Sequence, residues 1–499
     1  MKRFTVILLV FIFSVAIPSL RSQDRPDAPK EPAQKELRDD SPADLPNYDD
    51  DDATLEPRNE SKDPGNGSPD EPENYDDEER GAARTAPKRD AQSMKEGTTS
   101  SPFSQSQFVP DISFVLDASY NHRDRDNEIY KTQLRPGFIQ SMSGEAEHEH
   151  VAPNAVMRGF NFNYAELTLY SVVDPYFDLF AAIELTTAKV LIEEAYFCTT
   201  SLPFGFQLKT GKFLSSFGRI NEQHAHNWDF YDAPLVYEAF FGGDLNEVGV
   251  RATWVAPLDF YLMIGAEALQ GANAASFGAT GFADPNEIMR VRDSDDPNLG
   301  VGYIKTSFDI GDLTVYMGAS GAYGRSRINH GVDQAGVAGT AIAAHSHVLG
   351  ADLTLKYQFD SKRYCALQTE YLYRFMDGAY YAKNETDIVE EYALVKRQSG
   401  LYAQLVGKFA MRWRAGIRYD LLAVNDIKLD GIKESLPESL PRYSAMVDFN
   451  ATEFSRFRLQ YNYDHSMYVP RDGSFASRPN HEVVLQVNIT IGAHGAHAF

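Results

Sequence analysis

The fold is decided by residues 443–463, which have the sequence YSAMVDFNATEFSRFRLQYNY. On both sides of a short polar turn, apolar residues occupy every second position and polar or charged residues lie between them. Because successive side chains of a β-strand point to opposite faces, each half of this stretch has one apolar and one polar face. A charged face would leave unpaired charges in the core of a soluble sandwich, whereas a transmembrane barrel has lipid outside and water inside. The stretch therefore predicts one hairpin of a transmembrane β-barrel.

The same alternation extends outward from this hairpin through residues 108–499. Short turns alternate along this region with long polar loops, here termed excursions, as expected for periplasmic turns and extracellular loops. We expect short turns at residues 173–175, 201–205, 256–259, 309–312, 360–363, 411–412 and 451–453, and long excursions at residues 121–155, 215–246, 271–299, 325–344, 376–397, 423–440 and 466–480. Counting the hairpins predicts an all-β, antiparallel transmembrane barrel of about 16 strands, with both termini in the periplasm and an aqueous lumen.

Two other segments precede the barrel. Residues 1–22 place Lys2 and Arg3 before a short apolar run and small residues, which is the pattern of a secretory signal peptide. Residues 23–107 are rich in Asp, Glu and Pro, and residues 24–100 contain 23 acidic and 11 basic side chains. This composition predicts a disordered, acidic, Pro-rich tether in the periplasm.

Composition narrows the partners further. The formal net charge of −24 excludes a nucleic-acid binding protein, because a phosphate backbone calls for a basic surface. The apolar run in residues 1–22 is too short to span a membrane as a helix, and no other run approaches the necessary length. A membrane-embedded chain must therefore cross with strands. We therefore expect the bacterial outer membrane as the location and its lipid as a partner.

The excursion at residues 215–246 differs from the others, because it mixes large aromatic residues with charged ones. An exposed loop has no reason to contain so many aromatic side chains, whereas a loop packed against the inner wall does. We expect this loop to form the pore constriction; an external lid or a loop at a trimer contact is the alternative. The candidate constriction residues are Arg219, Glu222, His224, His226, Asp229 and Asp232.

Three His-x-His pairs occur among only 12 histidines. On an extended backbone each pair points both imidazoles to one side, which suits shared coordination of a divalent cation. The candidate ligands are His148, His150, His224, His226, His345 and His347. Simple solvated histidines are the alternative, because polar residues gather in loops. We expect no bound cofactor beyond a transient divalent cation such as zinc.

Part of the barrel sequence resembles the phosphate-selective porin family, and within it a histidine-bearing branch described as zinc-regulated outer-membrane proteins. The residues behind this resemblance are 165–169, 174–176, 193–196, 211–213, 217–219, the histidine segment 221–235 and the ending 492–499. The resemblance implies a sixteen-stranded porin fold, often a homotrimer, and a metal-related role for the histidines. Residues 108–499 hold 33 basic and 48 acidic residues, so we do not expect phosphate selectivity, and the tether lacks the heptads of a coiled-coil trimerisation segment.

Together these features predict a porin that forms a passive aqueous channel for small hydrophilic solutes or ions, selective for cations or divalent metals such as zinc. The transport alternative is an energy-coupled outer-membrane metal receptor, although the segment before the barrel is too polar to fold into a plug. A non-conducting structural or adhesive barrel is a third possibility. An outer-membrane hydrolase is the enzyme alternative, and we expect no enzyme because no catalytic constellation can be assembled from the sequence.

Overall fold

The computed structural model describes residues 110–139, 157–273, 275–283, 290–294, 297–330, 340–383, 388–471 and 474–492. The signal peptide, the tether, His148 and His150 lie outside these residues, so those expectations remain predictions. Within the described residues no helix has the length and apolar character needed to cross a bilayer.

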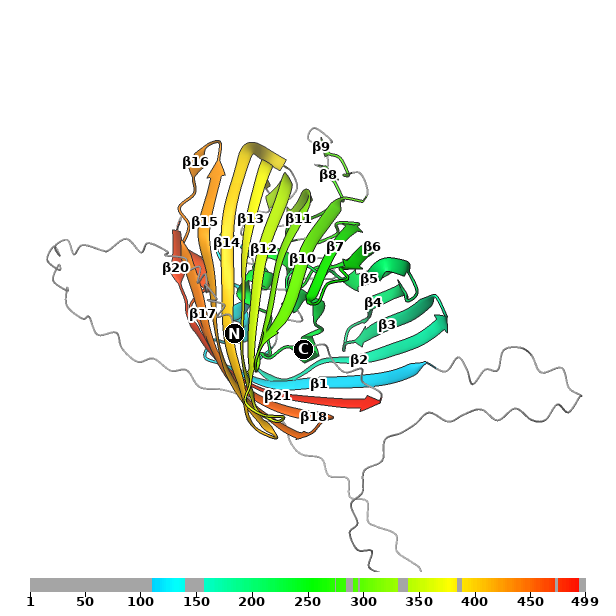
Figure 1. The fold of residues 1–499 in the computed structure, drawn as a ribbon. Coiled ribbons are helices and arrows are strands. Elements are labelled where there is room, and N and C mark those ends of the chain that lie inside the picture. Colours follow the sequence, from blue (N-terminus) through cyan, green and yellow to red (C-terminus); the bar gives the residue numbers. More distant parts are fainter. Residues whose placement is uncertain are drawn as a thin grey trace, which may run out of the picture. The chain divides into compact units, whose positions relative to one another are not determined.

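Sixteen long strands form one antiparallel sheet (Figure 1). They are β1 Asp111–Arg123, β2 Gly159–Asp174, β3 Phe177–Leu185, β4 Val190–Thr199, β5 Phe206–Leu214, β6 Asn246–Val255, β7 Tyr261–Leu269, β10 Leu299–Ile310, β11 Leu313–His330, β12 Thr340–Gln358, β13 Tyr364–Lys383, β14 Ile388–Ala410, β15 Trp413–Leu429, β17 Ser439–Thr452, β18 Ser455–Asp464 and β21 Asn480–Gly492. Short elements lie in the connections: β8 Phe282–Ala283 pairs with β9 Arg290–Val291, β16 Ile432–Lys433 extends β15, β19 Tyr468–Arg471 pairs with β20 Ser474–Ser477, and α1 covers Asn127–Lys131.

The sheet closes on itself. Each long strand pairs with the next one along the chain, and β1 pairs with both β2 and the last strand, β21. β1 begins and β21 ends at the rim where β2 and β3 are joined by a two-residue turn. The predicted sixteen-stranded antiparallel barrel, with both barrel ends at the short-turn rim, is therefore confirmed.

The alternation in the sequence becomes an outer and an inner face. Val447, Leu459 and Leu485 are cross-strand neighbours on β17, β18 and β21, and each is at least 40% exposed. The residue beside each of them, Asp448, Arg458 and Gln486, points inward and is at most 5% exposed. The outer face is thus apolar and the inner face polar, which is the arrangement that a bilayer around an aqueous interior requires.

The connections agree with the predicted short turns but not with all of the predicted excursions. Residues 325–344, 376–397 and 423–440 were expected to be loops, and this is wrong, because β11 to β17 continue through most of them as paired strands. β14 has 23 residues, about twice the 9–11 residues that span a membrane. Polar residues on both faces indicated loops, but beyond the lipid a strand pair can expose polar side chains on both faces. A further four-residue turn at 186–189 joins β3 to β4 on the rim opposite the short turns.

Candidate functional site

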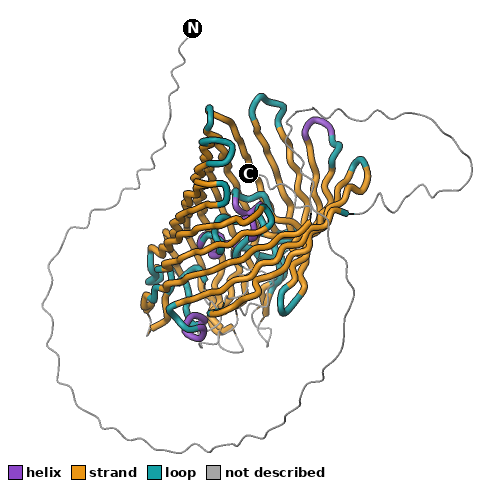
Figure 2. Tube along the Cα trace, turned by 90° about the horizontal axis from the view of Figure 1, so that it is seen from below, coloured by secondary structure: helices purple, strands orange, loops and turns teal. Residues whose placement is uncertain are grey.

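Residues 215–245, which we term the inner loop, connect β5 to β6 and fold into the barrel. The segment contains the single turns η3 Ile220–Glu222 and η4 Ala225–Asn227 and the helix α2 Leu235–Phe241. Figure 2 shows short helices enclosed by the strands. Side chains and backbone N–H groups of this loop contact inward residues from β2 round to β18, so the predicted position of residues 215–246 inside the barrel agrees with the structure.

An apolar core fixes the loop to the inner face of the barrel. Six of the seven residues of α2 are buried, and the helix packs against β14 and β15. Phe217 and Phe241 meet edge to face, with ring centroids 5.2 Å apart. Pro234 precedes α2, and Gly242 ends it in the left-handed conformation with φ 74°. Burial of this many aromatic groups makes the loop a packed part of the barrel rather than a lid.

The beginning of the loop is held by Glu370 of β13, which is 1% exposed. Its carboxylate accepts hydrogen bonds from the backbone N–H groups of Arg219 (3.0 Å) and Ile220 (2.9 Å). It also accepts from the hydroxyls of Tyr237 (2.7 Å) and Tyr402 (2.6 Å). Both oxygens of this carboxylate thus accept two hydrogen bonds each, and three of the four donors belong to the inner loop.

Gly218 permits this approach. Its φ is +66°, and a Cβ there would lie 2.2 Å from the Tyr237 hydroxyl and 2.3 Å from the Glu370 carboxylate. Its N–H donates to Ser320 and its carbonyl accepts from Lys305, which also pairs with Glu222 at 2.7 Å. The predicted constriction residue Glu222 is therefore paired with a lysine of the wall, and Arg219 lies over the ring of Tyr316.

A row of arginines on β15 and β17 holds the acidic side chains of the loop. Asp229 pairs with Arg414 at 2.9 Å. Asp232 pairs with Arg418 at 3.0 Å and with Arg442 at 2.7 Å. Burial alone would raise the pKa of Asp232, but Arg442 and Arg418 lower it to about 2. The candidate constriction acids Asp229 and Asp232 are thus paired with arginines of the wall and serve as anchors.

The wall formed by β2, β3 and β4, which β1 and β21 separate from β18, contains acidic side chains instead. Glu166 of β2 and Glu184 of β3 are directly opposed, and Glu194 of β4 pairs with Ala182 of β3 on the same inner face. The register of β3 and β4 shifts between Ala182 and Ile183, so Glu193 is the extra residue of a β-bulge. A bulge re-aims a side chain, and here it lets two consecutive glutamates approach one histidine.

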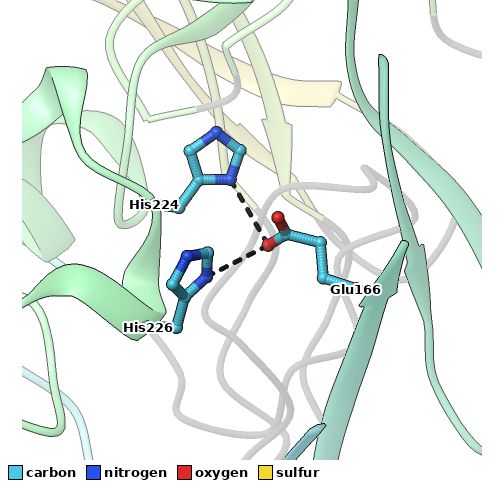
Figure 3. A group of neighbouring side chains, drawn as sticks. All are labelled: Glu166, His224 and His226. Carbon is cyan, nitrogen blue, oxygen red and sulfur yellow. Dashed lines mark hydrogen bonds and ion pairs between the residues drawn. The ribbon is translucent and has the colours of Figure 1, made fainter. Parts of the chain in front are cut away.

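That histidine is His224 of the inner loop. Its Nδ1 lies 3.3 Å from Glu166 Oε2 and 3.3 Å from Glu193 Oε2, and its Nε2 lies 2.8 Å from Glu194 Oε2. His226 Nδ1 lies 3.2 Å from the same oxygen of Glu166, so both imidazoles converge on one carboxylate (Figure 3). Burial alone would lower the pKa of His224, but Glu193 and Glu166 raise it well above its usual range. Glu166, His224 and His226 could hold a metal ion, since one ligand atom from each lies within 4.8 Å of the others.

The third histidine pair lies elsewhere. His345 and His347 point to the same side of β12, as their spacing predicts, but both are on the outer face of the barrel beside exposed Leu349. Their rings contact Tyr323 on the neighbouring strand β11. The structure therefore does not bring them together with His224 and His226.

Sequence reasoning identified the histidines of the site but not the carboxylates around them. The consecutive pair Glu193 and Glu194 within an alternating strand was the available signal, because only one of two neighbours can face inward in a regular strand. The arginine partners of Asp229 and Asp232 gave no local signal, since they are nearly 200 residues away along the chain.

No family model matches the chain. The chain is 48% identical over 400 residues to a protein of Aquifex aeolicus (strain VF5) described as "Uncharacterized protein", with 80% of this chain and 82% of that protein aligned.

Solved structures with a similar fold include three outer-membrane proteins. The trimer form of OmpT of Vibrio cholerae has a TM-score of 0.46 at 12% identity and covers 77% of this chain and 99% of that chain. The outer membrane channel DcaP of Acinetobacter baumannii has a TM-score of 0.45 at 11% identity, with coverages of 78% and 99%. The anion-selective porin from Comamonas acidovorans has a TM-score of 0.41 at 9% identity, with coverages of 77% and 100%.

Proposed function

The chain belongs to the same family as the Aquifex aeolicus protein, and we propose that it forms a passive, water-filled channel for small hydrophilic solutes in a bacterial outer membrane. The supporting observation is the closed sixteen-stranded barrel with an apolar outer face and a charged inner face, across which the inner loop is fastened. A barrel of this strand number is wide enough to leave an aqueous passage. The inner loop narrows that passage and so sets its size limit.

A finer proposal concerns ion selectivity. Glu166, Glu193 and Glu194 face histidines, whereas the acids of the inner loop are paired with arginine or lysine. Together with Glu184, these carboxylates give the β2–β4 wall an excess of negative charge. In a confined, low-dielectric passage such an excess attracts cations and repels anions. We therefore propose a preference for cations, including divalent metals such as zinc.

The size limit can be tested by solute flux. Proteoliposomes that contain the full-length protein should admit small sugars and exclude oligosaccharides, with rates that fall as solute size rises. Liposomes without protein and liposomes with heat-unfolded protein are the controls. Equal, slow entry of all solutes would instead support a non-conducting barrel that the inner loop blocks.

The charge preference can be tested by reversal potentials in a tenfold gradient of KCl. Glu184→Gln removes one carboxylate of the acidic wall without removing a residue that contacts His224, so the reversal potential should move toward the value for anions. An unchanged reversal potential would place the ion pathway away from β2–β4.

Two further proposals concern placement. Residues 23–107 would lie in the periplasm, and protease added to intact cells should then leave them uncleaved; cleavage from outside would reverse the topology. A homotrimer is the assembly that the sequence resemblance implies, and the native mass of the detergent-solubilised protein decides between one and three chains.

A further inference from the structure

We propose that Glu166, Glu193, His224 and His226 hold one resident divalent transition-metal ion, which clamps the inner loop to the β2–β4 wall. The inference goes beyond the channel function, because such a clamp would exist whether or not the barrel conducts. It concerns an ion that stays bound, in contrast to ions that pass through the lumen.

The spacing of the ligand atoms fits a tetrahedral site. Ligands about 2.0–2.2 Å from a zinc ion lie about 3.3–3.5 Å from one another in a tetrahedron. The distances between His224 Nδ1 and the oxygens of Glu166 and Glu193 are both 3.3 Å, and Glu166 lies 3.2 Å from His226 Nδ1. Glu166, His224 and His226 are thus close enough together to share one ion, and Glu193, which contacts His224, would complete the set by moving closer to the other two ligands.

Glu194 supplies the support that such a site needs. A metal-bound histidine usually donates its other ring N–H to a carboxylate, which fixes the tautomer and the ring orientation. Glu194 Oε2 lies 2.8 Å from His224 Nε2, on the far side of the ring from Glu166 and Glu193. Its other oxygen accepts from the N–H of Leu214 at 2.8 Å, so this carboxylate is itself held in place. With its Nε2 proton committed to Glu194, His224 presents the Nδ1 lone pair to the ion.

Two imidazoles and two carboxylates indicate the class of metal. Imidazole ligands suit zinc and neighbouring first-row metals, whereas magnesium and calcium prefer oxygen ligands only. With Glu193 as the fourth ligand the set would be complete, which is typical of a structural site, whereas a site for exchange keeps a position open. The set therefore favours zinc that is retained.

The ligands come from segments that are otherwise weakly joined. β4 pairs with β5 only through four residues, Ala195 to Cys198, so the half of β4 that contains Glu193 has no ladder to its neighbour on that side. His224 and His226 lie in the part of the inner loop before α2, on either side of Ala225, which packs at the edge of the apolar core. A metal ion here would connect β2, β4 and the loop at the point where backbone pairing is least.

Metal content of the purified full-length protein is the direct test. After loading with zinc and extensive dialysis, wild type should retain one zinc per chain by elemental analysis. Cobalt in its place should give the intense visible absorption of a tetrahedral site. The double variant His224→Gln with His226→Gln should lose this zinc, and Glu194→Gln should weaken its affinity about 10- to 100-fold. Glu184→Gln, an acid of the same wall outside the ligand set, is the matched control and should retain the metal.

The clamp is tested separately by proteolysis. Chelator should speed chymotrypsin cleavage in the inner loop near Trp228 and Phe230 in wild type, and should have no effect in the double histidine variant. Failure of wild type to retain zinc, or retention by the double variant, would overturn the proposal. So would cleavage that is insensitive to chelator, since protonated imidazoles paired with the glutamates would then hold the loop without metal. Solute flux is also measured in chelator, so that a failure of the metal proposal can be told apart from a failure of the proposed channel function.

Discussion

Replacement of Glu370 by Gln should release the beginning of the inner loop. The carboxylate accepts from four donors, two on each oxygen: Ile220 and Tyr402 on Oε1, and Arg219 and Tyr237 on Oε2. Glutamine keeps one accepting oxygen and presents an NH₂ group where the second oxygen was. Two of the four donors therefore lose their acceptor, while the other two keep a neutral and weaker one.

The magnitude follows from the number of bonds. A hydrogen bond to a charged group contributes about 1.5–3 kcal/mol, so the loss of two should destabilise the closed loop by about 3–6 kcal/mol. Even the lower figure raises the open population about a hundredfold, since each 1.4 kcal/mol is a factor of ten. Tyr402→Phe removes a donor that belongs to β14 of the wall and not to the loop, so it should raise the open population much less than Glu370→Gln does.

Trypsin provides a specific assay, because Arg219 is the only lysine or arginine in residues 215–245 and its peptide bond to Ile220 lies at the Glu370 anchor. When opening is fast relative to cleavage, the cleavage rate follows the population of the open loop. The order of rates should be wild type, then Tyr402→Phe, then Glu370→Gln. A Glu370→Gln rate within twofold of wild type, in a barrel that remains folded, would refute the anchoring role of this carboxylate.

Three other outcomes are expected. Gly218→Ala should speed the same tryptic cleavage, because a Cβ at φ +66° would contact the Glu370 carboxylate; unchanged cleavage would show that the loop adjusts without cost. The pKa of Asp232 is lowered from the usual 3.8 to about 2, so its stabilisation of about 2 kcal/mol is complete above about pH 4 and is lost as the pH falls through 2. Pepsin, which is active in acid, should therefore cleave the loop faster at pH 2 than at pH 4, after correction for the pH dependence of pepsin itself. The variant Asp232→Asn should show no such difference between the two pH values. Glu222→Gln combined with Asp229→Asn should shift the reversal potential toward anions, because the paired lysine and arginine lose their counter-charges; no shift would mean that ions do not pass these groups.

The sequence was sufficient to predict the barrel and the position of the inner loop. Alternation at period two is a local property, and it marked strands such as β17 and β18 correctly. The aromatic content of residues 215–246 is also a local property of the sequence. It distinguished the inner loop from the other excursions, because burial leaves a signal in the composition.

What the sequence could not predict depends on contacts between distant segments. The approach of Glu193 to His224 requires a β-bulge, which alternation alone does not indicate. The neutralisation of Asp229 depends on Arg414, a partner 185 residues later in the chain. The sequence predicts loops at the ends of strands such as β14, where the structure has strands. Outside the lipid the outer face of a strand can be polar, so the alternation of apolar and polar residues disappears.

The central claim is that an aqueous passage remains beside the anchored inner loop, and single-channel recording tests it most directly. Full-length protein, shown to be folded by resistance of its strands to detergent and protease, is added to a planar bilayer in symmetric KCl. We expect discrete, stable current steps, with a reversal potential in a salt gradient that favours potassium over chloride. A folded barrel that gives no current steps in this assay would contradict the claim and support a barrel sealed by its inner loop.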